Sequence, residues 1–495
     1  MFRWLLALIA ALALSACAQN PVTGTQDFVL MSEEQEIRMG RQTDQEVKRA
    51  YPVYDHKTGD ERSLERSLAA YVEELGKRLA AVAHRPGLEY RFTVLDSTEI
   101  NAFALPGGYT YFSRGLIAYL NSEAELAAVM GHELGHVTAR HSVKRASTSI
   151  ATDVTLALAS IVLRAPQGLQ QIAGLGAGAF LARYSREDEL QADRLGAEYV
   201  AKIGLNPEAA PQVVKVLKAQ EGFDAQIAQE EGRTPRDRHG LFASHPDNEL
   251  RLNEVTAEAR RIAQAAGVKS AYADDGAGRE RFLAHIEGMV FGDNTAQGVV
   301  RNNEFFHTDL GIALKFPPDW RIVNRPDRVI AIAPQREVEM TLLAEENIRG
   351  KEPSEMLKRG MNVEGTIDLN PIAGMKSAIA TGSWSRTRAG IYILGEPGRE
   401  KGYSIAALAR NADLLKKHLS VIDQALKSFR ATTEADKKLA QPLRIRIITA
   451  DPTTRYADLA KHSPIGKHAE AQLRLMNAHY PTGEPVAGQK LKIVE

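Results

Sequence analysis

The sequence predicts a multidomain protein of the α+β class. With 495 residues, the chain is too long for a single compact core. Apolar residues recur at helical spacing over much of its first half, whereas strand-like segments dominate beyond residue 301. Hydrophobic residues make up 44% of the chain and charged residues 25%, which is typical of a folded globular protein. We therefore expect a mainly helical domain with a small β-sheet edge, followed by an α+β domain.

The charge of the chain is balanced. Lysine and arginine together number 62, and so do aspartate and glutamate. Proteins that bind nucleic acid concentrate basic residues to match its phosphates, and the overall charge shows no such surplus. We expect no nucleic-acid partner.

The N-terminal segment has the pattern of an export signal. Arg3 precedes an apolar run over residues 4–14 that is too short to span a bilayer comfortably. Cys17, the only cysteine in the chain, follows the sequence LSA, and this order resembles the bacterial lipobox. The resemblance implies a signal peptide over residues 1–16 and a lipid on the Cys17 sulfur. The alternative is an ordinary secretion signal, cut after an alanine, with an incidental cysteine.

A lipid at Cys17 would tether the mature protein to a membrane surface. Ala18 follows the cysteine, in place of the aspartate that retains many lipoproteins at the inner membrane, so the resemblance implies the outer membrane. The predicted location is therefore periplasm-facing and lipid-anchored. With no second cysteine, the mature chain would form no internal disulfide.

Helices and strands alternate in the segment that follows. Residues 33–84 have the amphipathic pattern of helices. Residues 90–97 predict a strand, and residues 100–120 predict an extended piece, a Pro-Gly-Gly turn and a second strand. Ser122 with Glu125 three residues later forms a capping-box pattern, which predicts the start of a helix of several turns.

The next segment is unusually apolar. Residues 150–182 are rich in glycine, and Pro166 divides them into halves too short for a transmembrane helix. We expect a helical hairpin that covers the functional site or contacts lipid. A clear helical pattern resumes over residues 184–204, Pro207 opens another helix, and the chain around residues 220–240 predicts an exposed loop.

The second half of the chain contains more strand-like segments than the first half. Residues 272–282 suggest a domain boundary, and strand-like segments follow. We expect Phe316 and Trp320 to lie in the core of this α+β domain. Its last helix carries apolar residues along one face, namely Leu415, Leu419, Ile422, Leu426 and Phe429. The final fifty residues predict the order strand–helix–helix–strand and resemble a degenerate LysM module.

These patterns divide the chain into five predicted parts. They are a signal peptide over residues 1–16, a first domain over 17–270, a linker over 271–300, an α+β domain over 301–432, and the LysM-like module over 440–495.

The sequence HELGH at residues 132–136 is the strongest functional signal in the chain. On a helix, residues i and i+4 lie on one face, so His132 and His136 reach one tetrahedral Zn²⁺ at about 2.0–2.1 Å per bond. Glu133 projects beside the ion, where it can take a proton from a water of lowered pKa. With 13 histidines in the chain, we expect only about 0.02 chance occurrences of this pattern.

A catalytic zinc also needs a third protein ligand. The sequence EDELQAD at residues 187–193 offers Glu189 as this ligand. Asp193, one turn later on the same face, would accept a hydrogen bond from the outer nitrogen of a zinc-bound histidine. The small residues Ala192 and Gly196 favour close packing of this helix. For the other acidic residues of the segment we prefer the alternative, a solvated helix face.

With these residues, the chain resembles the HtpX/BepA and CAAX-prenyl-protease family of gluzincin metallopeptidases, in its periplasmic lipoprotein branch. The resemblance covers residues 17 to about 255 and rests on HELGH, ELQAD, NAFALPGG, and NPVTG after the cysteine. It implies a zincin-type protease fold with one Zn²⁺ per subunit, held by His132, His136 and Glu189. Glu133 would act as general base and acid.

The resemblance extends to two further segments. The strand at Asn101, Ala102, Phe103 and Ala104 resembles the edge that aligns an extended substrate by β-augmentation. His245 and Arg251 match the family's His-Pro…Arg stretch, which implies that His245 is an inhibitory fourth ligand or a donor to the oxyanion. The family usually has a second proline where this chain has Asp247, and the alternative for His245 is a surface histidine.

The sequence assigns no functional role to His141. It follows His136 by five residues, so a helical projection points it away from the ligand face and into solvent.

Together these observations predict a zinc-dependent endopeptidase anchored to the bacterial envelope. By resemblance, its substrates are misfolded or stalled envelope proteins, and the LysM-like module suggests contact with peptidoglycan. The alternative is a membrane-tethered periplasmic chaperone or assembly scaffold with a closed or residual metal site. The extra C-terminal domains and His245 motivate this alternative.

Overall fold

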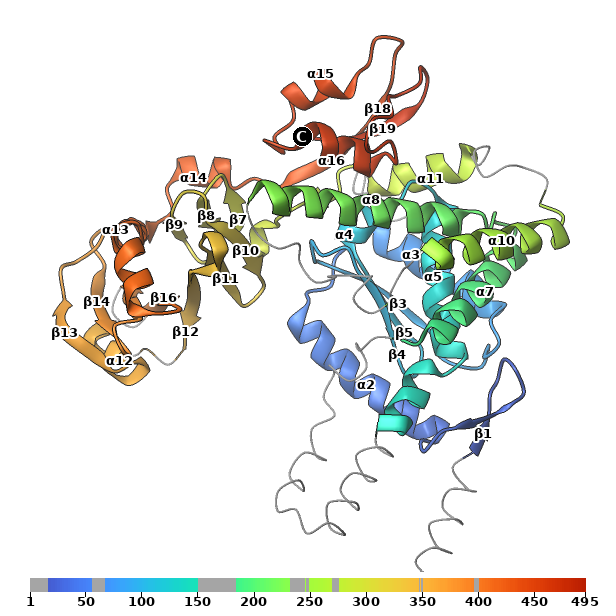
Figure 1. The fold of residues 1–495 in the computed structure, drawn as a ribbon, viewed down its shortest axis with the longest axis horizontal. Coiled ribbons are helices and arrows are strands. Elements are labelled where there is room, and N and C mark those ends of the chain that lie inside the picture. Colours follow the sequence, from blue (N-terminus) through green and yellow to red (C-terminus); the bar gives the residue numbers. More distant parts are fainter. Residues whose placement is uncertain are drawn as a thin grey trace, which may run out of the picture. The chain divides into compact units, whose positions relative to one another are not determined.

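A computed structural model describes residues 17–55, 67–149, 184–231, 245, 249–268, 276–346, 348, 350–395 and 400–495. The chain divides into two compact units (Figure 1). Unit 1 comprises Met1–Phe223, Arg236–Met289 and Arg444–Glu495, and unit 2 comprises Asp224–Pro235 and Val290–Leu443. The predicted signal peptide and the helical hairpin predicted over residues 150–182 lie outside the described residues.

Unit 1 is mainly helical with small sheets. Its elements, counting α8 and β18, which cross the division, are β1 (Cys17–Gln19), β2 (Gln26–Phe28), α2 (Glu33–Ala50), α3 (Leu68–Ala81), β3 (Arg91–Leu95), β4 (Ala102–Leu105), β5 (Tyr109–Ser113), α4 (Arg114–Ile117), α5 (Glu123–Thr138), α7 (Arg186–Lys202), α8 (Ala209–Glu230), α10 (Glu249–Ala265), α11 (Gly276–Ile286), β18 (Leu443–Thr449), α15 (Tyr456–Lys461), α16 (Ala469–Met476) and β19 (Lys490–Val494).

Local sequence signals explain where the first helices begin. Ser32 caps α2 in a capping box with Gln35, and the side chain of Ser67 caps α3. The helical pattern predicted over residues 33–84 is therefore present as two separate helices. Further along the chain, α8 continues to Glu230, so the prediction of an exposed loop from about residue 220 is wrong for residues 220–230.

The sheet of unit 1 nearest the functional motif has the strand order β3-β5-β4. β3 pairs with β5 in parallel, and β4 pairs with β5 antiparallel across the predicted Pro-Gly-Gly turn. This turn requires glycine, because Gly107 and Gly108 have φ values of 79° and 95°, and a Cβ on Gly108 would lie 2.7 Å from the Glu89 carbonyl oxygen. β4 is thus the edge strand of this sheet among the described residues, and its side chains are buried.

Unit 2 is built mainly from antiparallel strands. Its elements are β6 (Val290–Phe291), η4 (Thr295–Gln297), β7 (Val299–Arg301), β8 (Glu304–His307), β9 (Ile312–Lys315), β10 (Arg321–Arg325), β11 (Arg328–Ile332), η5 (Pro334–Arg336), β12 (Val338–Glu345), α12 (Pro353–Gly360), β13 (Val363–Asp368), β14 (Lys376–Gly382), β15 (Thr387–Leu394), β16 (Lys401–Ala409), α13 (Ala412–Ser428), β17 (Arg430–Ala431) and α14 (Glu434–Leu439).

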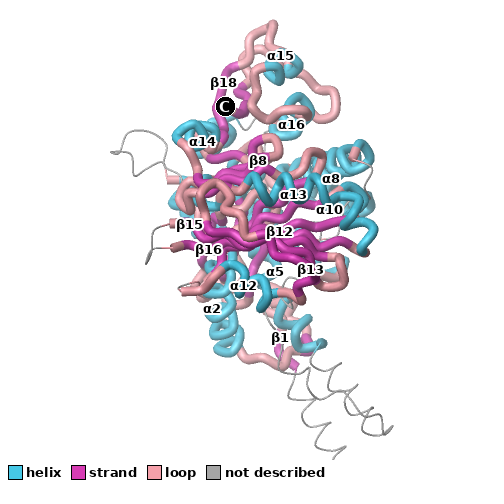
Figure 2. The backbone as a smooth tube through the Cα atoms, turned by 90° about the vertical axis from the view of Figure 1, so that its left-hand side faces the viewer, coloured by secondary structure: helices cyan, strands magenta, loops and turns pink. Residues whose placement is uncertain are grey.

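Seven of these strands form one sheet in the order β10-β11-β12-β16-β15-β14-β13. Side chains alternate between its faces, as the period of a strand requires. Ile405 and Ala407 join the larger apolar cluster with α13, whereas Ala406 faces the smaller cluster beneath Leu357 of α12. Figure 2 shows α12 and α13 on opposite sides of β12 and β16. Both faces of the sheet are therefore covered.

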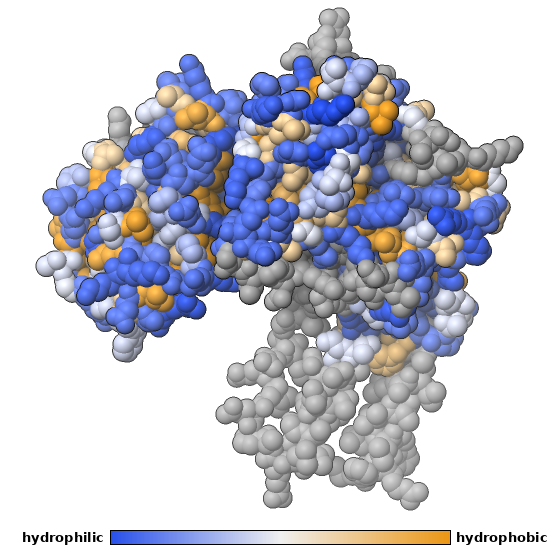
Figure 3. Space-filling view, turned by 45° about the horizontal axis from the view of Figure 1, so that its top comes forward, coloured by the Kyte–Doolittle hydropathy of each residue, from blue (hydrophilic) through white to orange (hydrophobic). Residues whose placement is uncertain are grey.

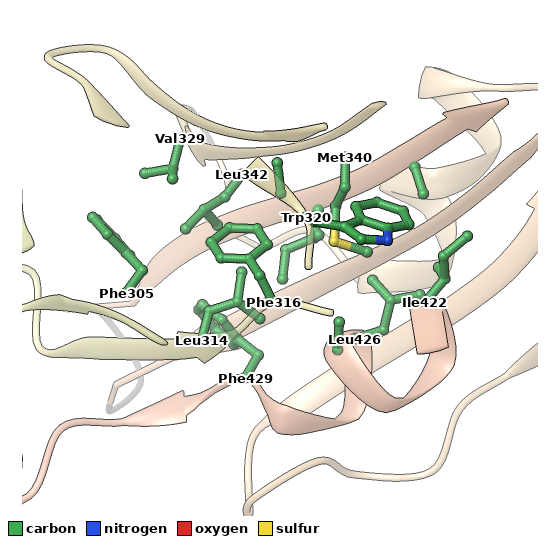
Figure 4. Packing of buried hydrophobic residues seen from close by; sticks show 14 of the residues in the cluster. Phe305, Leu314, Phe316, Trp320, Val329, Met340, Leu342, Ile422, Leu426 and Phe429 are labelled. Atoms are coloured by element: carbon green, nitrogen blue, oxygen red, sulfur yellow. The ribbon is translucent and has the colours of Figure 1, made fainter. Parts of the chain in front are cut away.

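The larger cluster confirms the predicted core of this unit. Phe316 and Trp320 are buried in it, and Ile422, Leu426 and Phe429 converge on them (Figure 4). Leu415 of the predicted helix face is also buried in the cluster. The mixed α+β fold is thus confirmed, and helix α13 presents the apolar face that its spacing predicts.

The last residues of the chain pack within unit 1. They have the predicted order strand–helix–helix–strand, with β18 antiparallel to β19. Lys492 on β19 is buried, and its side-chain nitrogen Nζ donates hydrogen bonds to the carbonyls of Ala118 (2.8 Å) and Leu120 (2.5 Å), just before α5. Residues 276–286, inside the predicted linker, form α11 with Phe282 and Ile286 buried.

One face of the molecule can be compared for hydropathy in Figure 3. On the face drawn in Figure 3, hydrophilic residues predominate and hydrophobic residues are scattered between them. Among the described residues, no helix has the length and apolar content that crossing a membrane requires.

Candidate metal centre

Helix α5 carries the HELGH sequence, and its ends are well defined. The Ser122 hydroxyl accepts a hydrogen bond from the Glu125 amide (3.1 Å), as predicted for the N-cap. The Glu125 carboxylate accepts instead from the Asn121 amide (2.6 Å). After Ala139, Arg140 has a φ of 58°, and this left-handed residue ends the helix. Its side chain is held by Glu36, which accepts from the Arg140 guanidinium at 2.8 Å.

Small residues bring α5 and α7 unusually close together. A Cβ added to Gly135 would lie 2.8 Å from the Cα of Ala192, and one added to Gly196 would lie 2.8 Å from the backbone nitrogen of His132. The backbones of the two helices therefore touch without intervening side chains. The predicted close packing at Ala192 and Gly196 is confirmed, and it places Glu189 of α7 opposite the two histidines of α5.

Four ligand atoms converge at this contact. They lie within 4.8 Å of one another and belong to His132, His136, Glu189 and His245. The Nε2 atoms of His132 and His136 are 3.0 Å apart, and Nδ1 of His245 lies 3.1 Å from Nε2 of His132.

The carboxylate of Glu189 completes the group. Its Oε1 lies 2.9 Å from Nδ1 of His245 and 3.5 Å from Nε2 of His136. Four ligand atoms at tetrahedral angles around one zinc ion are about 3.3–3.5 Å apart, given bonds of about 2.0–2.2 Å. The observed distances, 2.9–3.5 Å, are close to this value. Nitrogen and carboxylate donors are also those that zinc prefers, so these residues fit the ion.

Glu133 lies beside the group but outside it. Its side chain is 1% exposed, and neither carboxylate oxygen has a hydrogen-bond partner among the described residues. Burial raises the pKa of Glu133, because the charged form loses its hydration. The nearest partner is Nε2 of His245, 3.5 Å from Oε1. A buried carboxylate that accepts no hydrogen bond is costly, so its position beside this centre indicates a ligand that it can bind.

Asp193 holds His132 as the sequence predicts. Oδ1 of Asp193 lies 2.8 Å from Nδ1 of His132, the nitrogen facing away from the ligand group. Arg251 in turn donates to both oxygens of Asp193 (2.8 and 2.9 Å) and contacts Glu189 at 2.7 Å. Burial opposes ionisation of Asp193, but the charges of Arg251 and His132 outweigh it and lower the pKa of Asp193. The carboxylate is therefore ionised when it accepts this bond.

His141 was predicted to be solvated, and this prediction is wrong. Its side chain is 1% exposed, and its Nδ1 lies 2.9 Å from Nδ1 of His136. The left-handed conformation of Arg140 ends the helical path of α5. The His141 side chain therefore lies against His136 of that helix instead of pointing into solvent. Tyr184, which precedes α7, stacks on His136 with ring centroids 3.8 Å apart. Neither contact is visible in the local spacing of the sequence.

A small apolar cavity of about 50 Å³ adjoins the centre. Glu133 and His245 line one side of it. The other lining residues are mostly aliphatic and come from α5, α8 and α10: Ala128, Val129, Ala210, Val213, Val214, Leu217 and Val255.

The remaining predicted site residues lie elsewhere in unit 1. Ala102, Phe103 and Ala104 belong to the edge strand β4, and Asn101 immediately precedes it. The backbone of Cys17 begins β1, which pairs with β2. His245 is 2% exposed and is not the surface histidine of the alternative interpretation.

Comparison with known proteins identifies relatives of this part of the chain. Residues 66–259 match the model of peptidase family M48. The putative beta-barrel assembly-enhancing protease of Vibrio cholerae is 32% identical over 266 residues, which are 51% of this chain and 51% of that protein. The beta-barrel assembly-enhancing protease of Escherichia coli K12 is 29% identical over 251 residues, 49% of this chain and 47% of that protein.

This chain is also similar to a mitochondrial protein. The mitochondrial metalloendopeptidase OMA1 of Schizosaccharomyces pombe is 29% identical over 241 residues, 48% of this chain and 64% of that protein. The alignments with the beta-barrel assembly-enhancing proteases span about half the length of those relatives. The matched region contains His132, Glu133, His136, Glu189 and His245. This chain therefore carries a metallopeptidase domain of family M48, which confirms its resemblance to the gluzincin metallopeptidases.

Proposed function

We propose that this protein is a zinc-dependent endopeptidase of the bacterial envelope that cleaves misfolded or stalled envelope proteins. One observation carries the proposal: four ligand atoms converge at zinc-like distances, and the unpartnered carboxylate of Glu133 lies beside them. His132, His136 and Glu189 would hold one Zn²⁺ per subunit. When bound, the ion would polarise the scissile carbonyl and acidify water.

Glu133 performs the proton transfers in this proposal. It accepts a proton from the attacking water and delivers it to the nitrogen of the leaving amine. Its raised pKa suits this double role, because a carboxylate with a higher pKa is a stronger base. Asp193 keeps the Nδ1 proton of His132 pointing outward, which leaves Nε2 free to bind the metal.

The substrate is proposed to lie along β4. An extended peptide can add by backbone hydrogen bonds to the edge of this strand that pairs with no described strand, at Asn101, Ala102, Phe103 and Ala104. The aliphatic cavity beside Glu133 suits an apolar side chain of the substrate. Both features favour unfolded polypeptides, which offer extended backbone and exposed apolar residues.

His245 is proposed to act as an inhibitory fourth ligand. Structural zinc sites use four protein ligands, whereas catalytic sites keep one position open. Because Nδ1 of His245 lies among the ligand atoms, its placement favours inhibition over donation to the oxyanion. Cleavage then requires His245 to leave. The variant His245→Ala should raise basal proteolysis with zinc content unchanged, and unchanged proteolysis would refute the inhibitory role.

The envelope location rests on the N-terminal pattern. We propose a signal peptide over residues 1–16, lipid attachment at Cys17, and a periplasm-facing position at the outer membrane. The two relatives named beta-barrel assembly-enhancing protease support an envelope role. We further propose that the protease region spans residues 17–270 before a linker over 271–300, that residues 301–432 form a separate domain, and that the LysM-like residues 440–495 contact peptidoglycan.

A second function is favoured by the closed set of four ligand atoms. A site that His245 never leaves would be structural, and the protein would then act as a membrane-tethered chaperone or assembly scaffold.

The variant Glu133→Gln separates the two functions. It keeps all four ligand atoms but removes the base. For an endopeptidase, the purified full chain loses casein cleavage by more than a hundredfold while zinc content by metal analysis stays at one per chain, and a chelator abolishes cleavage by the unmodified protein. A scaffold cleaves nothing in any of these forms, and cells carrying Glu133→Gln keep an intact envelope. Absence of zinc from the unmodified protein would refute the proposed enzyme.

A further inference from the structure

His141 connects a predicted metal ligand to helix α7. Its Nδ1 lies 2.9 Å from Nδ1 of His136, and its Nε2 lies 3.0 Å from Oε1 of Gln191 and 3.5 Å from a carboxylate oxygen of Asp188. The His141 side chain that makes these contacts is almost completely buried. Both ring nitrogens of His141 are therefore engaged, one on each helix.

The hydrogen bonds allow one assignment of the protons. Nε2 of His136 faces the other ligand atoms, so a metal-binding His136 carries its proton on Nδ1. That N–H donates to Nδ1 of His141, which must accept and therefore carries its own proton on Nε2. The Nε2–H then donates to Oε1, the side-chain amide oxygen of Gln191. Every donor in this chain of bonds meets an acceptor.

We propose that His141 is a positioning residue that fixes the tautomer and ring orientation of His136 for metal binding. The inference rests on the proposed metallopeptidase function and assigns a role to a residue outside the predicted ligand set. Tyr184 stacks on the face of the His136 ring, and the bond from His141 lies at its edge. Together they restrict both the tilt and the rotation of the imidazole. Such outer partners raise metal affinity by preorganising the ligand.

The two imidazoles of α5 differ in this respect. His132 has a charged partner, Asp193, which Arg251 neutralises. A carboxylate in place of His141 would add a further negative charge near Glu189, and burial makes uncompensated charge costly. A neutral imidazole supplies the acceptor without the charge. This explains why a histidine, and not an acid, suits the position behind His136.

The test compares three variants of the full-length protein. His141→Leu removes the acceptor at similar volume, His141→Asn keeps an acceptor oxygen near the place of Nδ1, and Gln191→Leu removes only the far end of the chain of bonds. Zinc affinity is measured by competition with a chromogenic chelator. We expect His141→Leu to weaken it about 10–100-fold, His141→Asn to restore most of the affinity, and Gln191→Leu to have an intermediate effect.

A second readout separates positioning from packing. The visible absorption of the Co²⁺-substituted protein reports ligand geometry, and we expect it to shift in His141→Leu but not in His141→Asn. Thermal unfolding of the metal-free variants measures the structural cost. If His141→Leu does not fold, the test rests on Gln191→Leu, with His141→Asn as the comparison.

Two results would overturn the role of His141. One is zinc affinity and a Co²⁺ spectrum equal to those of the unmodified protein in His141→Leu, or in Gln191→Leu if His141→Leu does not fold. The other is equal losses in Leu and Asn variants that track thermal destabilisation alone. If zinc affinity and the Co²⁺ spectrum are unchanged while Glu133→Gln still loses cleavage, the role of His141 is rejected and the proposed function is retained.

Discussion

Helices α5 and α7 meet through glycine and alanine, whereas the core of unit 2 is filled by large aromatic and aliphatic side chains. In the first region Gly135 faces Ala192 with backbone-to-backbone contact. In the second, Phe429 packs against Tyr392 and Tyr403 with ring centroids 4.6 and 5.4 Å apart. Burial of apolar area stabilises the core of unit 2. The small residues between α5 and α7 instead allow the two helix backbones to lie close together.

The difference shows what a metal centre needs from its surroundings. Imidazole and carboxylate groups on two helices reach one ion only if the helix axes are close, and large residues at the contact would prevent this. The ligand groups themselves are polar and buried, so they add little stability before the metal binds. The comparison therefore predicts that substitutions in unit 2 change mainly stability, whereas substitutions at the α5–α7 contact change metal binding.

The largest expected effect is in unit 2. Phe429→Ala removes a fully buried ring and should lower the free energy of unfolding by about 3–5 kcal/mol. Apart from Trp4 in the predicted signal peptide, the tryptophans of the chain are Trp320 and Trp384, both in unit 2. Tryptophan fluorescence during urea unfolding therefore follows this unit. A loss below about 1 kcal/mol would mean that the cluster does not hold unit 2 together.

The next effect tests the helix contact with a single methyl group. A Cβ at position 135 meets the Ala192 backbone at 2.8 Å, so Gly135→Ala should force α5 and α7 apart, cost about 1–3 kcal/mol and lower zinc content. Gly222→Ala is the matched control, because Gly222 also lies in a helix but its added Cβ meets nothing within 4 Å. The control should gain about 0.5–1 kcal/mol by helix propensity. Equal behaviour of the two variants would contradict the close contact.

A smaller effect concerns a buried carboxylate that is fully partnered. Asp436 accepts from Arg430, the Thr433 hydroxyl and the Thr433 amide, and the hydrogen bond of Arg430 holds the pKa of Asp436 well below its ordinary value. Asp436→Asn should cost about 1 kcal/mol, the difference between charged and neutral hydrogen bonds.

The pH dependence of this cost has a definite sign. The native pKa of Asp436 lies below the unfolded value of 3.8, so its stabilisation is complete above about pH 4. It is lost as the pH falls through the native pKa. The difference between Asp436→Asn and the unmodified protein, measured by urea unfolding, should therefore be constant from pH 5 to 7 and shrink below pH 4. A difference that grows on acidification would contradict the assignment.

The smallest effect concerns the unpartnered carboxylate of Glu133. Because its burial raises its pKa and its oxygens lack hydrogen bonds within the described residues, the charge destabilises the metal-free fold. Glu133→Gln should therefore leave the metal-free protein as stable as before or up to about 1 kcal/mol more stable, even though it removes the base. Thermal unfolding after chelation measures this. A clear loss of stability would mean that Glu133 has a structural partner.

Much of this arrangement follows from sequence, and the exceptions have physical causes. Helical periodicity places His132 and His136 on one face of α5, and apolar spacing identifies the buried face of α13. The same periodicity failed for His141, because Arg140 adopts a left-handed conformation and the helix does not continue. Spacing rules assume an unbroken helix, and the Arg140–Glu36 hydrogen bond that supports the break joins residues 104 positions apart.

Contacts between segments that lie far apart in the sequence could not be predicted from residue spacing either. The sequence suggested Glu189 as a ligand from its residue type and neighbours, but the convergence of His245 with Glu189 depends on how α7 and α10 pack. The ligand roles themselves remain predictions that metal analysis will test.

The buried side-chain amino group of Lys492 links two distant parts of the chain. It donates hydrogen bonds to two backbone carbonyls that precede α5, so β19 is attached to the segment that leads into the HELGH helix. A molecule that binds residues 444–495 and displaces β19 would therefore also displace the segment at the N-terminal end of that helix. Cutting these residues away would leave two backbone oxygens stranded at the entrance of the helix that carries the zinc-binding histidines.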